Sequence, residues 1–184
     1  QVIDPVAMRF DENGRMWVVE MGDYPLGIDG EGKPGGIVRF LEDPNGDGKY
    51  EKSTVFLDGL RFPTGVLPWG RGVLVSAAPE IFYAEDTDGD GRADIRKVLF
   101  QGFGEGNQQH RVNGFEYGLD NWVYGANGDS GGEIRSVGAL FSESSGAVRN
   151  SKDAVNIRGR DFRFRPNEGL FEMVSRFVIR GRIP

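Results

Sequence analysis

The sequence predicts an all-β protein that forms part of a β-propeller. The 184 residues include 29 Gly and 9 Pro, so helix breakers recur too often for long helices to propagate. Short runs rich in β-branched and aromatic residues lie between these breakers, at residues 16–19, 72–75, 122–124 and 162–164. An internal repeat then narrows the all-β class to a propeller.

The repeat has an offset of 43 residues. Residues 37–60 align with residues 80–103, and seven of the aligned positions are identical. The segment 10–18 returns as 117–124, with a weaker copy at 67–75. Each unit would hold four short strands in roughly 40–50 residues, the period of a propeller blade. About three to four units fit in the chain, so we expect a partial propeller; a complete β-sandwich is the alternative.

Composition and charge exclude several classes of protein. The 22 basic and 28 acidic residues give a net charge of −6. Residues 149–184 are basic while residues 1–148 carry a net −11, and an acidic bulk argues against nucleic acid as a partner. No apolar run approaches the roughly 18 residues of a membrane span. The absence of cysteine excludes disulfides, thiolate metal sites and attached haem.

Two acidic loops occupy equivalent places in the repeat. The first offers Asp43, Asn45, Asp47 and Glu51, and the second offers Asp86, Asp88, Asp90 and Asp94. Oxygen ligands at loop positions 1, 3, 5 and 9 with Gly at position 6 match the first part of a calcium loop. Thr54 and Lys97 replace the bidentate Glu of position 12, so we expect calcium-type turns between strands. A metal-free turn rich in Asp and Asn is the alternative.

His110 is the single histidine and lies in a polar, Gly-rich stretch, residues 102–114, ahead of a predicted strand. We expect a loop at one rim of the sheets, where functional residues collect. Histidine is suited to general base catalysis near neutral pH. A solvated loop histidine without a catalytic role is the alternative.

The segment 128–132 has the sequence Gly-Asp-Ser-Gly-Gly, which formally fits the serine-hydrolase elbow. That elbow needs a helix directly after the serine, yet two glycines follow Ser130. We therefore expect a turn here and no protease.

These residues carry a resemblance to a known family. The His-to-Gly-Asp blade motif of soluble quinoprotein glucose/sorbosone dehydrogenases resembles three stretches of this sequence: residues 110–115, residues 117–124 and Gly128-Asp129. The segments 10–20 and 36–40 are similar to the first blade of that family.

Residues 1–174 also resemble the N-terminal propeller of bacterial proteins classed as membrane-bound dehydrogenases. The stretches 18–25, 62–68 and 104–114 are typical of that group. Residues 175–184 depart from its pattern, so we expect a partial propeller domain over 1–174 and a divergent or truncated end.

The resemblance implies a six-bladed propeller with pyrroloquinoline quinone as cofactor and a sugar or other alcohol as substrate. His110 would be the catalytic base, and Arg111 and Asn113 are candidate cofactor contacts. The resemblance also implies a periplasmic or extracellular protein, membrane-associated in some full-length forms, whose partner is a cytochrome c-like domain outside this chain. A non-catalytic, calcium-stabilised propeller that binds glycans or a protein is the competing hypothesis.

Overall fold

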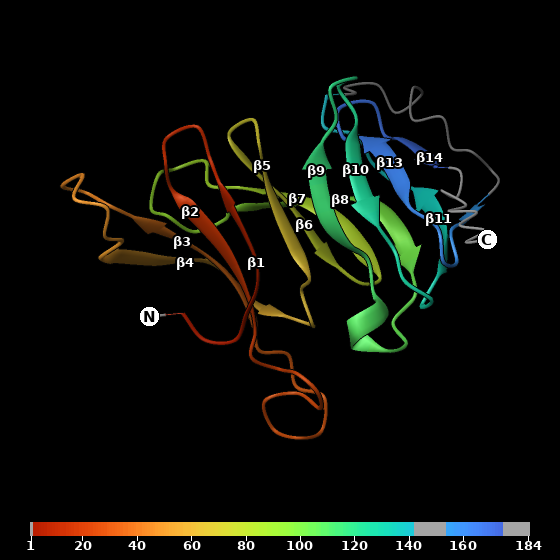
Figure 1. Cartoon of the computed structure of the whole chain (residues 1–184), viewed down its shortest axis with the longest axis horizontal. Helices are drawn as coiled ribbons and strands as arrows, with labels where there is room; N and C mark the ends of the chain where they lie inside the picture. The colour runs from red at the N-terminus through yellow and green to blue at the C-terminus, as the bar shows by residue number, and fades with distance from the viewer. Residues whose placement is uncertain (1, 142–153, 175–184) are drawn as a thin grey trace, which may run out of the picture.

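The computed structural model describes residues 2–141 and 154–174, whose regular structure is β-strand apart from one 3-10 turn (Figure 1). The first sheet is antiparallel and follows the order of the sequence. Its strands are β1 (Pro5–Phe10), β2 (Met16–Met21), β3 (Gly36–Glu42) and β4 (Lys52–Leu60). The predicted all-β class is confirmed.

The second sheet has six strands and is not formed in simple sequence order. Four come in succession: β5 (Gly65–Trp69), β6 (Gly72–Ala77), β7 (Glu80–Glu85) and β8 (Ile95–Phe103). A hairpin of β11 (Gly132–Ser136) and β12 (Val155–Asn156) then pairs with the outer edge of β8.

The third sheet is interrupted in sequence by that hairpin. Its strands are β9 (Asn113–Tyr117), β10 (Val123–Ala126), β13 (Phe162–Arg165) and β14 (Leu170–Met173). The turn η1 (Gln108–His110) lies between β8 and β9. In the described part of the chain, no helix is long and apolar enough to cross a membrane.

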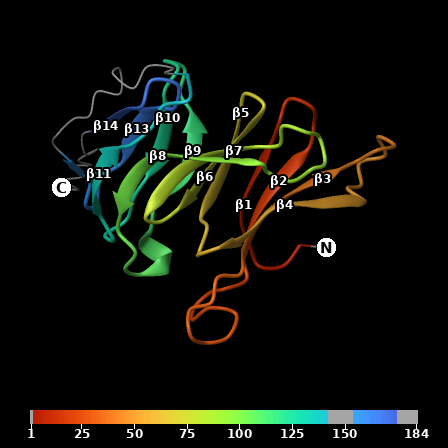
Figure 2. The same ribbon diagram turned by 180° about the vertical axis from the view of Figure 1, so that it is seen from behind.

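The three sheets are arranged like successive blades. Their first strands, β1, β5 and β9, lie next to one another, and the remaining strands spread outward to β4 on one side and β14 on the other (Figures 1 and 2). Three sheets in series form a propeller-like arrangement rather than the two layers of a sandwich. Six blades and a domain boundary at residue 174 stay predictions, and residues 175–184 lie outside the described residues.

The 43-residue repeat coincides with the strands. Its two copies are the hairpins β3–β4, at the outer edge of the first sheet, and β7–β8, in the middle of the six-stranded second sheet. The second pattern marks the turns β1–β2, β5–β6 and β9–β10. Local sequence therefore predicted the hairpins correctly. It did not predict that β11 and β12 belong to the second sheet.

The second sheet is buried on both faces because it lies between the other two. Val73 and Val75 face a core shared with the first sheet, where the Trp17 and Phe56 rings meet edge to face at 4.8 Å. Leu74 faces the core shared with the third sheet. All six residues of β6 are accordingly buried, and these two cores hold the sheets in series.

Candidate functional site

The loops of the sheets divide between two ends of the molecule. Because β7 and β8 are antiparallel, the acidic loop 86–94 lies at one end and the loop 104–112 with η1 lies at the other. The first sheet repeats this arrangement, with the acidic loop 43–51 opposite the long loop 22–35. The candidate base and the candidate metal ligands are therefore on opposite rims (Figure 1).

His110 ends the short turn η1, which its own sequence stabilises. The Asn107 side chain caps the turn by accepting a hydrogen bond from the Gln109 amide at 2.9 Å. The backbone amide of His110 donates to the Asn107 carbonyl at 3.0 Å. The sequence predicted a loop here, and within that loop these two bonds form an ordered turn.

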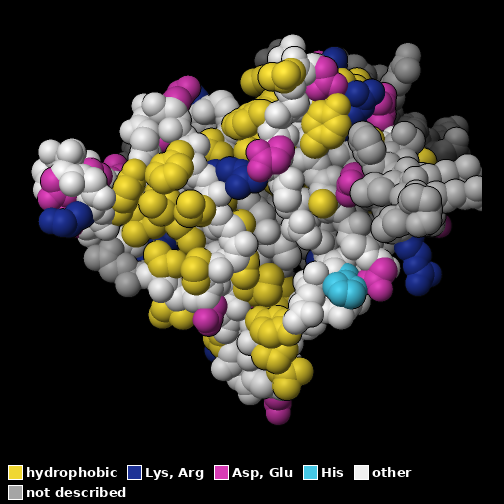
Figure 3. Space-filling view, in the orientation of Figure 1, with side chains coloured by type: hydrophobic (Ala, Val, Ile, Leu, Met, Phe, Trp, Pro, Cys, Tyr) yellow, Lys and Arg dark blue, Asp and Glu magenta, His cyan; other side chains and the backbone are white. Residues whose placement is uncertain are grey.

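Asp129 is the partner of His110. Its Oδ1 lies 2.5 Å from His110 Nδ1, and the two side chains are 69% and 46% exposed. Figure 3 shows the histidine at the surface beside an acidic side chain. A carboxylate on Nδ1 favours the Nδ1–H tautomer, which leaves the lone pair of Nε2 free to accept a proton.

Gly128 allows this pairing. A Cβ at position 128 would lie 2.7 Å from the His110 carbonyl oxygen and 2.9 Å from its Cα, so any side chain would push the loop away. Asp129 was not among the site residues predicted from the sequence. The sequence feature that could have identified Asp129 is its place in Gly128-Asp129, the end of the motif that carried the family resemblance.

A cleft of about 870 Å³ opens beside η1, between the first strands of the three sheets. Residues from all three sheets and their loops line it, among them Arg9, Tyr24, Gln108, Gln109 and Asn113. His110 directly follows Gln109 in sequence. His110 and Asp129 do not themselves line this cleft, and Asp129 lines a separate pocket of about 500 Å³ with Asn107 and Ser130. The cleft is a mixed polar and apolar site whose lining comes within one residue of His110 along the chain.

Asn113 and Arg111, the predicted cofactor contacts, have different surroundings. Asn113 lines the cleft and donates from Nδ2 to the Arg111 carbonyl at 2.8 Å. Arg111 is only 4% exposed and is not among the residues that line the cleft. Its guanidinium donates to the carbonyls of Glu105 and Gly106 at 2.5 and 3.4 Å. Burial lowers the pKa of Arg111, while Glu105 and Asp23 oppose that shift.

Ser130 is not arranged as a nucleophile. Its hydroxyl donates to the Asn107 carbonyl at 3.1 Å, whereas His110 is paired with Asp129. The arrangement agrees with the expectation that the Gly-Asp-Ser-Gly-Gly segment is a turn.

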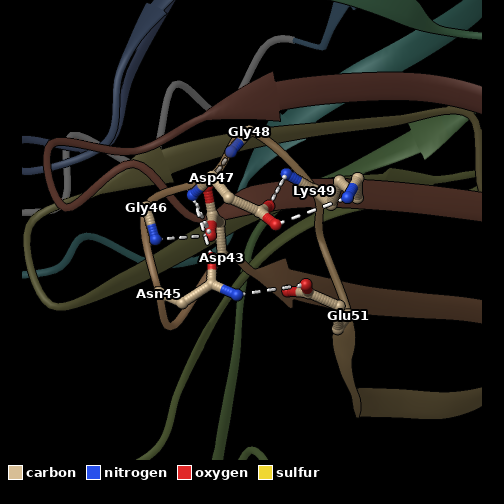
Figure 4. Close-up of polar contacts among 7 residues, drawn as sticks. All are labelled: Asp43, Asn45, Gly46, Asp47, Gly48, Lys49 and Glu51. Atoms are coloured by element: carbon tan, nitrogen blue, oxygen red, sulfur yellow. Dashed lines mark hydrogen bonds and ion pairs between the residues drawn. The ribbon is translucent and has the colours of Figure 1, made fainter.

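The first acidic loop folds around Asp43, as Figure 4 shows. Asp43 accepts hydrogen bonds from the amides of Gly46 and Gly48, both at 2.7 Å. The bond from Gly48 is the largest of several that lower the pKa of Asp43. Carboxylate oxygens of Asp43, Asp47 and Glu51 lie within 4.8 Å of one another, and Asn45 donates to Glu51 at 3.4 Å.

The second acidic loop repeats this geometry. Asp86 accepts from the amides of Gly89 and Gly91 at 2.7 and 2.8 Å. Carboxylate oxygens of Asp86, Asp88 and Asp94 come within 4.8 Å of one another. Asp90, a predicted ligand, is not in this group.

The donor sets fit calcium in their chemistry. Each loop brings three carboxylates together, and calcium prefers such hard oxygen ligands. The fit concerns the type of donor atom and the closeness of the carboxylate oxygens in each loop. The identity of the ion is a proposal. The backbone hydrogen bonds within each loop already give these turns a defined shape without an ion.

Pyrroloquinoline quinone fits the described residues less well. It carries carboxylates, which are best held by unpaired cations. Among the described residues that line the cleft, Arg9 is the sole cation, and it is already bonded to the Phe115 carbonyl at 2.7 Å and ion-paired with Glu116. The described residues that line the cleft thus supply neutral polar groups and one paired arginine, but no unpaired cation for this cofactor.

Solved structures similar to this chain include a quinoprotein domain. The holo form of the pyranose dehydrogenase PQQ domain from Coprinopsis cinerea matches with a TM-score of 0.54 and 14% identity, over 94% of this chain and 48% of that one. A candidate 6-phosphogluconolactonase from Bacteroides uniformis matches with a TM-score of 0.49 and 16% identity, over 93% and 56%. The chain therefore spans about half the length of these structures, and the first of them supports the propeller-like fold.

No curated protein matches the sequence. The sequence pattern of DUF7133, described as a domain of unknown function, matches residues 1–178. Because that match covers nearly the whole chain, this protein belongs to the DUF7133 family.

Proposed function

We propose that this chain is part of a quinoprotein-like propeller that oxidises the hydroxyl group of a sugar or other alcohol, with His110 as the base. The His110–Asp129 pair is the observation that carries the proposal. It combines a carboxylate 2.5 Å from Nδ1 with an exposed ring that directly follows Gln109, which lines a cleft of substrate size. The similarity to a pyranose dehydrogenase PQQ domain suggests the reaction class.

The pair would work by moving one proton. Nε2 of His110 takes the proton of the substrate hydroxyl, and the adjacent carboxylate of Asp129 stabilises the imidazolium that forms. The carbon that bears the hydroxyl gives up a hydride, and the substrate becomes a carbonyl compound. A two-electron acceptor would have to take that hydride, and pyrroloquinoline quinone is the acceptor that the resemblance implies. Cations for its carboxylates would come from outside the residues that line this cleft.

Two further features belong to this proposal through the resemblance alone. The intact protein would be exported to the periplasm or the exterior, and a cytochrome c-like domain would accept the electrons. A third feature rests on the loops themselves: the two acidic loops would bind calcium and stabilise the rim opposite the cleft.

The test uses the full-length protein that contains this chain, with pyrroloquinoline quinone and calcium added. We expect dye-linked oxidation of one or more sugars or alcohols. His110→Ala should lose about 10²- to 10⁴-fold in kcat/KM, the usual contribution of a general base. Asp129→Asn should lose activity through the wrong tautomer, and Ser130→Ala should stay near wild type.

The competing function predicts a different result. Absence of a spectral change with quinone, no oxidation, and retention of glycan or protein binding by His110→Ala would favour the non-catalytic propeller. Activity that survives in His110→Ala would also reject His110 as the base.

A further inference from the structure

Two loops from different sheets meet next to the candidate site. Gln109 Nε2 donates to the Tyr24 hydroxyl at 2.8 Å, and Gln108 Nε2 donates to the Pro25 carbonyl at 3.0 Å. The loop 22–35 of the first sheet thereby contacts η1, which carries His110. Both of these hydrogen bonds are solvent-exposed, so on their own they would hold the loops weakly.

Beneath these contacts lies a buried acid, Asp23. It is fully shielded from solvent, and its Oδ2 accepts the backbone amide of Phe62 at 2.8 Å. In the described part of the structure, its other oxygen, Oδ1, has no hydrogen-bond partner. Burying a carboxylate with one oxygen unbonded is costly, so this position is unfavourable for stability alone.

Phe62 connects the acid to Arg111. Its backbone has φ of +46°, a strained conformation for a bulky residue that persists only where the surroundings enforce it. The hydrogen bond to Asp23 is one such constraint. The Arg111 guanidinium is another, since it lies over the Phe62 ring at 4.9 Å from the centroid.

Arg111 completes the cluster. It follows His110 directly and bonds back to the carbonyls of Glu105 and Gly106, which lie on the other side of η1. The guanidinium therefore clamps both ends of the segment that presents His110. Its Nε and Nη1 have no hydrogen-bond partner among the described residues. A buried cation bonded in this incomplete way is weak evidence for a stabilising role.

We propose that Asp23 and Arg111 are positioning residues for His110. Asp23 fixes Phe62 under the guanidinium, and Arg111 closes the 105–111 loop so that the imidazole meets Asp129. The inference rests on the proposed function of His110, but it concerns the geometry of the loop and is testable without an assay of activity. Its consequence is that the first sheet, through Asp23, controls a histidine that lies between the second and third sheets.

The single histidine makes the test direct. In the protein labelled with ¹⁵N-histidine, the two ring nitrogens report which tautomer the neutral ring adopts. Wild type should show mainly Nδ1–H, because Asp129 accepts from that nitrogen. Arg111→Met should give a mixture of tautomers, and amide exchange over residues 104–110 should be about tenfold faster or more, as expected from loss of a charge-assisted bond.

Arg39→Met is the matched control. Arg39 is also a mostly buried arginine, and it is ion-paired with Glu20 at 2.8 Å on the first sheet. Its loss should lower stability without changing the His110 tautomer. Arg111→Lys should restore part of the Nδ1–H population because it keeps the charge.

Asp23→Asn provides a second route if Arg111→Met does not fold. It keeps the shape of the side chain and should shift the His110 signals in the same direction by a smaller amount. A wild-type tautomer and unchanged exchange in Arg111→Met, or in Asp23→Asn where the former is unfolded, would overturn the proposal. If these variants show the expected changes in tautomer and exchange, but the wild-type protein has no quinone-dependent activity, the result would instead count against the proposed function.

Discussion

At the scale of single residues, Asp11 organises the first inner turn. Its carboxylate accepts from Arg15 Nε at 2.7 Å and from Trp17 Nε1 at 2.9 Å. It also accepts from the backbone amides of Asn13 and Arg15 at 2.9 and 3.0 Å. Burial alone would raise the pKa of Asp11, but the hydrogen bonds from Trp17 and Arg15 outweigh burial and lower it.

Asp11→Asn should destabilise the protein by about 1–3 kcal/mol at pH 7, since charge-assisted hydrogen bonds are lost. Because the pKa is lower in the folded state, the wild-type advantage is present above the unfolded value, roughly 3.9. It disappears as the pH falls through the folded value. Urea denaturation at pH 7 and at pH 3 measures both stabilities.

Asp58→Asn is the control for this change. Asp58 is 60% exposed at its side chain and pairs with Arg92, so its loss should cost less than about 1 kcal/mol. Two results would contradict the role given to Asp11. One is an equal loss of unfolding free energy in the two variants at pH 7. The other is a difference in unfolding free energy between wild type and Asp11→Asn that is as large at pH 3 as at pH 7.

At the scale of elements, the acidic loop 86–94 links two sheets. The Ala93 amide donates to the Phe56 carbonyl of β4 at 3.0 Å, and Arg92 pairs with Asp58 of the same strand at 2.8 Å. An ion that ordered this loop would therefore also stabilise the contact between the first and second sheets.

Calcium should raise the melting temperature, and a chelator should reverse the effect. At 100 times the Kd, binding adds about 2.7 kcal/mol to the free energy of unfolding. The double variant Asp86→Asn, Asp88→Asn should lose the part of the calcium-induced rise in melting temperature that is due to the second loop. Calorimetric titration measures uptake; no heat of binding and no thermal shift would exclude a calcium site.

The hairpin β11–β12 depends on close contact with β8. Gly102 of β8 has φ of +109°, and a Cβ there would lie 2.2 Å from the Glu133 carbonyl oxygen of β11. The absence of a side chain lets the two backbones approach at the irregular pairing between these strands.

Gly102→Ala should therefore cost about 2 kcal/mol or more, because backbone strain and a steric clash act together. Gly14→Ala is the matched control, since Gly14 has φ of +77° and open space around its Cβ position. It should cost about 1 kcal/mol from strain alone. Denaturant unfolding compares the two, and equal losses would mean that the β8–β11 contact can relax.

At the scale of the whole molecule, the first sheet leaves apolar side chains in solvent. Val6, Met8 and Phe10 alternate along β1 and are 48%, 53% and 52% exposed. Ala7, between two of them, packs instead against the core. Figure 3 shows hydrophobic side chains gathered over β1 and β2. A patch of this kind next to an unpaired strand edge favours association.

We expect the isolated chain to be oligomeric or poorly soluble. Met8→Gln with Phe10→Ser should shift it toward monomer with little loss of stability, because both side chains are about half exposed. Leu119→Gln removes an exposed leucine from the β9–β10 turn and should leave association unchanged. Sedimentation velocity at several concentrations measures this, and a monodisperse wild-type monomer would contradict the expectation.

Local sequence accounts for the all-β class, the hairpins and the shape of the acidic turns. These features are local: alternation of side chains, glycine in turns and Asp side chains that bond to nearby amides act within about ten residues. The repeated segments 37–60 and 80–103 fell on equivalent hairpins for this reason.

The composition of the candidate site depends on how the sheets pack and could not be predicted from local sequence. Asp129 is 19 residues from His110 and meets it because the β10–β11 loop returns to η1. Arg111 could be expected in a cofactor site from its place in the sequence, yet packing on Phe62 and bonds to nearby carbonyls bury it. Contacts between sheets set these positions, because they depend on how whole sheets pack rather than on the spacing of residues within one hairpin.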